Sequence, residues 1–134
     1  MKEDSRKQTG RIGLSKAIDY FTIHGYTVSL PLNDTQYYDL VVEKDTKFYT
    51  VQCKATKTNN SSIDFRNTGG TKGCVYANSL DDPVDYFFCI DKDFNCYLIP
   101  RNDLLAFGTT RSICLKRTEA QNKQGFPTYK YYVK

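Results

Sequence analysis

Several features that mark well-known classes of protein are missing from this sequence of 134 residues. It contains no long apolar run, and its first ten residues are largely polar, so neither a transmembrane helix nor a secretory signal is predicted. We therefore expect a cytoplasmic protein with no membrane partner. The phosphate-binding pattern G-x-x-x-x-G-K-[ST] is also missing, and we expect no nucleotide cofactor.

The cysteines argue against two further kinds of site. Their number is odd and no two of them form a CxxC pair, which disfavours both a zinc site and a disulfide framework. Most lie in apolar or β-like stretches, where a free thiol packs as a small hydrophobic side chain. The sequence predicts buried structural thiols at Cys53, Cys74, Cys89, Cys96 and Cys114.

The length allows one domain that buries roughly two thirds of the surface exposed by the unfolded chain. We interpret residues 10–134 as that domain and residues 1–9 as a flexible lead. The net charge of +4 is compatible with binding to nucleic acid but does not establish it. Eleven Tyr and eight Phe, with no Trp, are expected mostly to fill half-buried strand faces.

The first predicted element is an amphipathic helix over residues 11–24. Leu14, Ala17, Ile18 and Phe21 follow the i, i+3, i+4, i+7 spacing of one helical face, and Gly25 stands where a helix commonly ends. Short β-rich segments follow, and this order predicts an α+β fold with a central sheet and the helix on one face. Strands are expected at residues 26–30, 38–43, 47–55, 62–65, 84–90, 96–99, 113–116 and 129–133, with a helical turn at 102–107.

Three polar residues gather on the hairpin predicted for residues 38–55. Gln52 and Lys54 are two positions apart on one strand, so their side chains project from the same face, whereas Cys53 points the opposite way, into the core. If the strands pair across a turn at residues 44–46, Asp39 lies roughly opposite the end that carries Gln52 and Lys54.

This combination of groups suits the hydrolysis of a phosphodiester. An Asp carboxylate, a Gln side-chain carbonyl and a backbone carbonyl are oxygen ligands for a hard divalent cation, which polarises a phosphate and acidifies a bound water. An adjacent Lys can orient that water, help to deprotonate it or neutralise developing charge. The spacing Asp–x(12)–Gln–x–Lys also arises in unrelated sequences, where it marks a solvated strand edge.

Residues 11–56 resemble the PD-(D/E)XK nucleases of the group I intron-associated homing endonuclease type. Members of that group continue from a Gly-flanked helix through a G-Y-x-V-x-x-P strand and a Y-D-L-V strand to a V-Q-x-K strand, in which Gln replaces the usual acidic residue. The matching segments are residues 25–28 with Pro31, residues 38–41 and residues 51–54. A looser likeness continues to residue 100, and archaeal Holliday-junction resolvases share the same core fold.

The resemblance implies a restriction-endonuclease-like fold with a central mixed sheet. It also implies that Asp39 binds the metal, that Gln52 is a metal ligand or near-ligand, and that Cys53 contributes its backbone carbonyl. Lys54 is then the catalytic lysine, and the cofactor is Mg²⁺ or, in its place, Mn²⁺.

One position departs from the family pattern. Many members carry on the first helix a Glu that faces the metal, where this sequence has Leu14 and Ser15. Asp19 lies a turn further on and is expected to face away, and Asp34 in the following loop is a weak substitute. The departure puts a second metal and full catalytic strength in doubt.

Basic residues near the hairpin and in the C-terminal segment are candidates for contacts with DNA phosphates, although each is also explained as a solvated surface charge. These candidates are Lys57, Arg66, Lys72, Arg111 and Lys116. The Gly-rich loop of residues 67–73 either approaches a DNA backbone or is a plain loop. The pairs Asp81/Asp82 and Asp91/Asp93 are interpreted as turn residues, and the single histidine, His24, as structural.

The combined hypothesis is a Mg²⁺-dependent, homing-endonuclease-like enzyme that hydrolyses double-stranded DNA. Cutting both strands takes two active sites, so we expect a homodimer or homotetramer. Two alternatives stay open. One is a structure-selective Holliday-junction resolvase, and the other is a catalytically weak module that uses a nuclease fold to bind DNA or protein.

Overall fold

A mixed sheet of six strands forms the centre of the computed structural model, which describes residues 5–33, 36–65, 79–108 and 112–134. Its strand order is β1 (Thr27–Ser29), β2 (Leu40–Lys44), β3 (Lys47–Ala55), β5 (Tyr86–Ile90), β6 (Cys96–Pro100) and β8 (Tyr132–Val133). Strands β3 and β5 run parallel, and the other neighbouring pairs are antiparallel. A separate antiparallel pair consists of β4 (Ser62–Asp64) and β7 (Ser112–Cys114). The predicted α+β fold with a central mixed sheet is confirmed.

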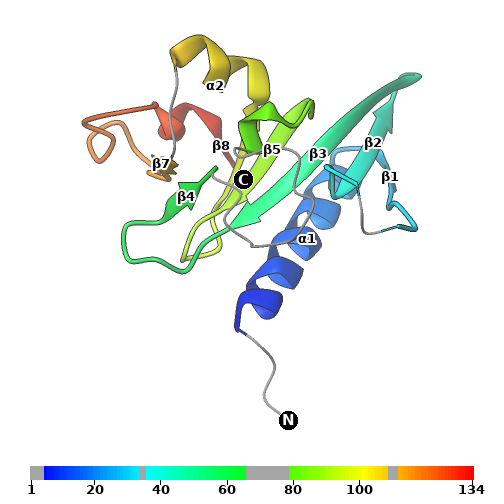
Figure 1. Cartoon of the computed structure of the whole chain (residues 1–134), viewed down its shortest axis with the longest axis horizontal. Coiled ribbons are helices and arrows are strands. Elements are labelled where there is room, and N and C mark those ends of the chain that lie inside the picture. Colours follow the sequence, from blue (N-terminus) through cyan, green and yellow to red (C-terminus); the bar gives the residue numbers. More distant parts are fainter. Residues whose placement is uncertain (1–4, 34–35, 66–78, 109–111) are drawn as a thin grey trace.

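The helices α1 (Ser5–Ile23) and α2 (Arg101–Phe107) lie on opposite sides of this sheet, and the β4–β7 pair lies on the α2 side (Figure 1). Two short 3-10 turns, η1 (Ser79–Asp81) and η2 (Thr128–Tyr131), complete the described elements. Each side has its own core. The core between α1 and the sheet consists of Ala17, Phe21, Leu40, Val42, Val51, Phe88 and Ile90. The core on the other side of the sheet includes Ile63, Phe65, Phe87, Cys89, Ile99, Leu104 and Ile113.

The helix α1 begins at Ser5, well before the predicted start at Arg11. Residues 5–9 are therefore helical and do not belong to a flexible lead, while residues 1–4 lie outside the described part of the chain. Thr9 lies within the helix, where its hydroxyl donates to the Ser5 carbonyl at 2.8 Å. The prediction relied on apolar spacing, and these first turns are polar, so they give no such signal.

A glycine brings α1 close to the sheet. A Cβ atom at Gly13 would lie 3.3 Å from the Cβ of Ala55 and 3.4 Å from Cδ1 of Ile90. The helix thus packs closely on the side chains of Ala55 in β3 and Ile90 in β5. None of the helices in the described part of the chain is long and apolar enough to cross a membrane.

The four cysteines in the described residues are free thiols. Cys89 is buried, as predicted, whereas Cys53 and Cys96 are only half-buried. Cys114 is exposed, because the alternation along β7 turns its neighbour Ile113 inward instead. Cys74 lies outside the described residues.

The turn between β2 and β3 consists of two residues, Asp45 and Thr46, at the predicted place. Both have positive φ angles, 54° and 65°, and Lys44 pairs with Lys47 across them. Such two-residue turns match the twist of the flanking strands and favour glycine, because a Cβ atom is strained at positive φ.

Replacing Thr46 with Gly should raise the free energy of unfolding by about 1 kcal/mol, because glycine adopts a positive φ without that strain. The matched control, Thr46→Ala, keeps the Cβ atom and should change the free energy of unfolding by less than about 0.5 kcal/mol. Urea unfolding of the three proteins measures both differences. Equal effects of the two substitutions would mean that the turn holds no strain at this residue.

Candidate active site

The predicted site residues meet at one end of the β2–β3 hairpin. Leu40 pairs with Val51, so Asp39, one residue earlier, stands opposite Gln52 in the continued register. The Asp39 amide donates to the Val51 carbonyl at 2.9 Å. In return, the Cys53 amide donates to Oδ2 of the Asp39 carboxylate at 2.7 Å. Backbone pairing therefore fixes the Asp39 carboxylate beside β3.

The side chains of Gln52 and Lys54 project from the sheet face that α1 does not cover. In the parallel pairing Gln52 lies beside Phe87 and Lys54 beside Cys89, and both partners belong to the core on the α2 side. Cys53 packs instead in the core beneath α1. The alternation expected from the sequence is present, and only the backbone of Cys53 is available to the site.

A second carboxylate, that of Asp82, lies beside Gln52. This residue follows η1 and is only 6% exposed, and its Oδ2 accepts a hydrogen bond from Nε2 of Gln52 at 3.5 Å. Sequence reasoning assigned Asp82, together with Asp81, to turn formation; Asp82 does lie in a bend, but the contact of its side chain with Gln52 was not predicted. No local pattern marks this contact, because the approach of Asp82 to Gln52 depends on the parallel pairing of β5 with β3.

Burial displaces the pKa of the lysine at the site. The pKa of Lys54 is lowered, chiefly because surrounding protein atoms exclude water from its ammonium group. The carboxylates of Asp39, Asp82 and Asp64 oppose this effect. The ammonium nitrogen also lies 5.7 Å from the ring centroid of Phe65. Lys54 thus lies in a partly desolvated, acidic environment, and it loses its proton more readily than an exposed lysine does.

Partial loss of water raises the pKa of both carboxyl groups, although Asp39 is still exposed at the surface whereas Asp82 is buried. For Asp39, loss of water outweighs the hydrogen bond from Cys53 and the charge of Lys54, both of which lower the pKa. For Asp82, loss of water outweighs the hydrogen bond from Gln52 and the charge of Lys54. Each carboxylate therefore gains from an added positive charge nearby.

The amide oxygen of Gln52 has the chemistry of a ligand for a cation at this site. This atom, Oε1, is buried and accepts no hydrogen bond from the described residues. A buried oxygen without a partner is unfavourable unless something binds it, and an amide oxygen beside the Asp39 carboxylate suits a hard divalent cation. Among the described residues no three His, Cys, Asp or Glu side chains form a metal-binding group. A cation at this place would therefore depend on Asp39 and carbonyl-type oxygens.

The helix α1 does not supply the missing carboxylate. Leu14 packs against the core beneath α1, and Ser15 is exposed. Asp19 is also exposed, and it lies close enough to Cys96 to raise the pKa of that thiol, so it belongs to the α1 side of the sheet. Asp34 lies outside the described residues.

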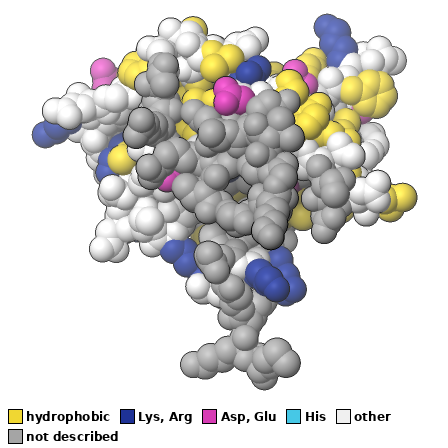
Figure 2. Space-filling model, in the orientation of Figure 1, with side chains coloured by type: hydrophobic (Ala, Val, Ile, Leu, Met, Phe, Trp, Pro, Cys, Tyr) yellow, Lys and Arg dark blue, Asp and Glu magenta, His cyan; other side chains and the backbone are white. Residues whose placement is uncertain are grey.

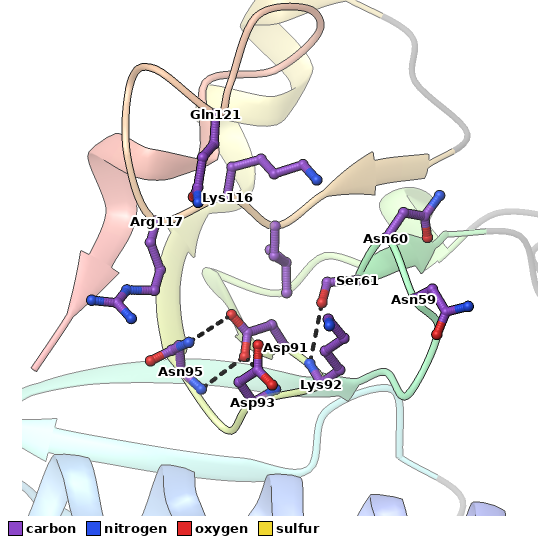
Figure 3. A pocket seen from close by; sticks show the side chains of 11 residues that line it. Asn59, Asn60, Ser61, Asp91, Lys92, Asp93, Asn95, Lys116, Arg117 and Gln121 are labelled. Atoms are coloured by element: carbon purple, nitrogen blue, oxygen red, sulfur yellow. Dashed lines mark hydrogen bonds between the residues drawn. The ribbon is translucent and has the colours of Figure 1, made fainter.

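The cations predicted to contact DNA are only partly described. Lys57 is exposed just beyond the end of β3. Lys116 lines a polar cavity of about 460 Å³ together with Lys92 and Arg117 (Figure 3). Among the described residues, the basic side chains on the face seen in Figure 2 are scattered and do not gather into one patch. The remaining candidates, Arg66, Lys72 and Arg111, lie outside the described residues.

The acidic turn that borders this cavity has the structural role predicted for it. One oxygen of Asp91 accepts the backbone amides of Asp93 and Asn95, each at 2.9 Å. The other oxygen accepts the side-chain amide of Asn95 at 3.0 Å (Figure 3) and the hydroxyl of Tyr97 at 3.0 Å. These bonds occupy Asp91 within the β5–β6 turn.

Comparison with known proteins decides the family. A family model described as PD-(D/E)XK endonuclease matches residues 4–132. The chain belongs to the PD-(D/E)XK endonuclease family. This membership supports nuclease activity and implies DNA as the substrate, and nucleases of the family generally use divalent metal ions.

The endonuclease is also similar to a solved structure. It matches that of a bacterial homing endonuclease, I-Ssp6803I, with a TM-score of 0.67 and 23% sequence identity. The match covers 94% of this chain and 86% of the other, and it confirms the restriction-endonuclease-like fold. No curated protein matches the sequence.

Replacing Asp39 with Asn should stabilise the metal-free endonuclease at neutral pH. Asparagine keeps an oxygen for the Cys53 amide and removes a charge that partial loss of water disfavours, an effect that solvent keeps small because Asp39 is exposed. Because the pKa of Asp39 is raised in the folded state, its ionised form is destabilising above that pKa. The gain should shrink as the pH falls through the folded pKa and vanish below the ordinary pKa of an Asp.

Thermal unfolding between pH 3 and pH 8 without divalent cations measures this gain. The control, Asp93→Asn, removes an exposed charge from a turn and should leave the melting temperature almost unchanged at every pH. A difference between Asp39→Asn and the wild type that does not vary with pH would contradict the prediction.

Proposed function

We propose that the protein is a Mg²⁺-dependent endonuclease that hydrolyses double-stranded DNA at the site of Asp39, Gln52 and Lys54. The observation that carries the proposal is the buried Gln52 Oε1, which lacks a hydrogen-bond partner in the described residues and belongs to the residue opposite Asp39 in the strand register. The residues that would hold the cation are Asp39, Gln52 and, through its backbone carbonyl, Cys53. When bound, the cation would polarise the phosphate and make a water molecule more acidic.

Lys54 would act on the attacking water and on the phosphate. Its side chain projects from the same strand face as Gln52, so it would reach a phosphate placed at the cation. The lowered pKa supports a role in taking a proton from the water, because an amine that loses its own proton more readily is more often in the neutral form that can accept one. In its charged form the same group would neutralise negative charge that develops on the phosphate.

The DNA would lie along the face of the sheet from which Gln52 and Lys54 project. Lys57 at the end of β3 and Lys116 in the neighbouring cavity are the described candidates for phosphate contacts. Arg66, Lys72 and Arg111 complete the proposed set. One chain of this size offers one such site, so cleavage of both strands would require a homodimer or homotetramer. Sedimentation equilibrium tests that assembly.

Replacing Lys54 with Ala should lower the rate of DNA cleavage at least about hundredfold, because the only cation of the proposed catalytic trio is removed. Lys47→Ala is the matched control, since Lys47 is exposed at the opposite end of β3, roughly 20 Å away. Cleavage of supercoiled plasmid in Mg²⁺ gives the rates. Binding to the same DNA in Ca²⁺ should be retained by both variants.

The outcome for Lys54→Ala separates catalysis from simple binding. If the variant cleaves linear duplex and four-way junction DNA as fast as the wild type, the assigned site is wrong. If the wild type binds DNA but cleaves neither substrate with Mg²⁺ or Mn²⁺, the fold serves only for binding.

Replacing Lys57 with Ala should weaken DNA binding about three- to tenfold at moderate salt and leave the cleavage rate of bound DNA unchanged. The physical reason is the loss of one phosphate contact, which should also reduce the slope of log affinity against log salt by about 1. Fluorescence anisotropy over a salt series measures both, with Lys47→Ala again as the control. An unchanged salt slope would remove Lys57 from the DNA-binding surface.

A further inference from the structure

The side-chain amide of Gln52 carries an oxygen at one end and an NH2 group at the other, and the two ends have nearly the same shape. Half a turn about the last side-chain bond exchanges them. A cation binds only the oxygen, whereas the pairing of β3 fixes the backbone and leaves this choice open. A neighbour of Gln52 must therefore select the orientation.

Asp82 is the neighbour that distinguishes the two ends. A carboxylate only accepts hydrogen bonds, and Oδ2 of Asp82 lies 3.5 Å from Nε2 of Gln52. The amide oxygen is turned away and stays buried, without a hydrogen-bond partner in the described residues. In the reversed orientation two oxygens would face each other with no proton between them, which is unfavourable at a buried position.

The segment that carries Asp82 is fixed by contacts that do not involve Gln52. Upstream, the Leu80 carbonyl accepts a hydrogen bond from Nε of Arg101 at 2.7 Å, which ties η1 to the start of α2. Downstream, the Thr50 amide donates to the Asp85 carboxylate at 2.8 Å, which ties the segment to β3. Asp82 is thus held from both sides, and Gln52 adapts to it.

We propose that Asp82 is a positioning residue that holds the Gln52 amide with Oε1 directed toward a divalent cation, without itself contacting that cation. The inference rests on the proposed function, because it assumes a cation at Asp39 and Gln52. It explains why a buried acidic residue that no catalytic pattern includes lies beside a neutral residue of the site.

The first test compares Mn²⁺ binding to the full chain without DNA, by isothermal titration calorimetry. Asp82→Asn should weaken Mn²⁺ binding about tenfold, because a second amide can pair with either end of Gln52 and the orientation is lost. The matched control is Asp81→Asn, which removes the same charge from the exposed neighbouring residue and should change the affinity by less than about twofold. Equal losses in both variants would assign the effect to net charge and overturn the positioning role.

A donor–acceptor exchange gives a second readout that does not depend on cleavage. Gln52→Glu alone sets two carboxylates against each other and should lower the melting temperature of the metal-free protein. In combination with Asp82→Asn, the new amide donates to the new carboxylate, and the net charge equals that of the wild type. The double variant should regain the melting temperature and bind Mn²⁺ within about threefold of the wild type or more tightly. Additive losses in the double variant would contradict the inference.

A crystal of the wild-type protein soaked in Mn²⁺ shows the geometry directly. Anomalous density beside Asp39 and Gln52, with Asp82 still on the Nε2 side, is the expected result. Density coordinated by Asp82 would make it a ligand and overturn the inference. Failure of the two proposals is distinguishable: unchanged Mn²⁺ affinity in Asp82→Asn refutes the positioning role alone. A wild type that binds no Mn²⁺ refutes the metal site and, with it, the positioning role.

Discussion

The position of β3 between an antiparallel and a parallel neighbour is the constraint on which the site depends. Because side chains alternate along a strand, a slip of one residue would turn Gln52 and Lys54 toward α1 and bring Cys53 to the site. Such a slip would also expose Val51, which is fully buried beneath α1. The apolar core on one face of the sheet therefore enforces the polar arrangement on the other, and Gly13 strengthens it by letting α1 approach closely.

Without a bound cation or phosphate, the partial loss of water around Asp39, Lys54 and Asp82 is electrostatically unfavourable. Loss of water displaces the pKa of Lys54 downward and the pKa values of Asp39 and Asp82 upward, in each case toward the neutral form. Their mutual attraction offsets only part of this effect. A cation beside the carboxylates and a phosphate beside the lysine would supply the missing opposite charges.

Local patterns in the sequence were sufficient for most of the elements and for bringing the trio together on the hairpin. The strand predicted at residues 129–133 is wrong in its first part, because η2 occupies Thr128–Tyr131 and β8 is limited to Tyr132–Val133. The alternation in residues 47–55 and the turn that follows residue 44 placed Asp39, Gln52 and Lys54 correctly, since both depend on near neighbours in the chain. Asp82 was missed, because its contact with Gln52 spans 30 residues and requires a parallel pairing that no local pattern reveals. The start of α1 was missed for a different reason: exposed polar turns carry no apolar spacing.

The charge balance of the site bears on the order in which metal and DNA bind. Leu14 and Ser15 stand where many family members carry Glu on the first helix, and Gln52 is neutral, so among the described residues Asp39 is the anionic side chain proposed to bind the cation while Asp82 is engaged with Nε2 of Gln52. An amide oxygen attracts a divalent cation less strongly than a carboxylate does, but it also repels a phosphate less. The scissile phosphate then supplies the negative charge that the protein lacks. Metal and DNA should therefore each strengthen the binding of the other by the same factor, as linkage requires.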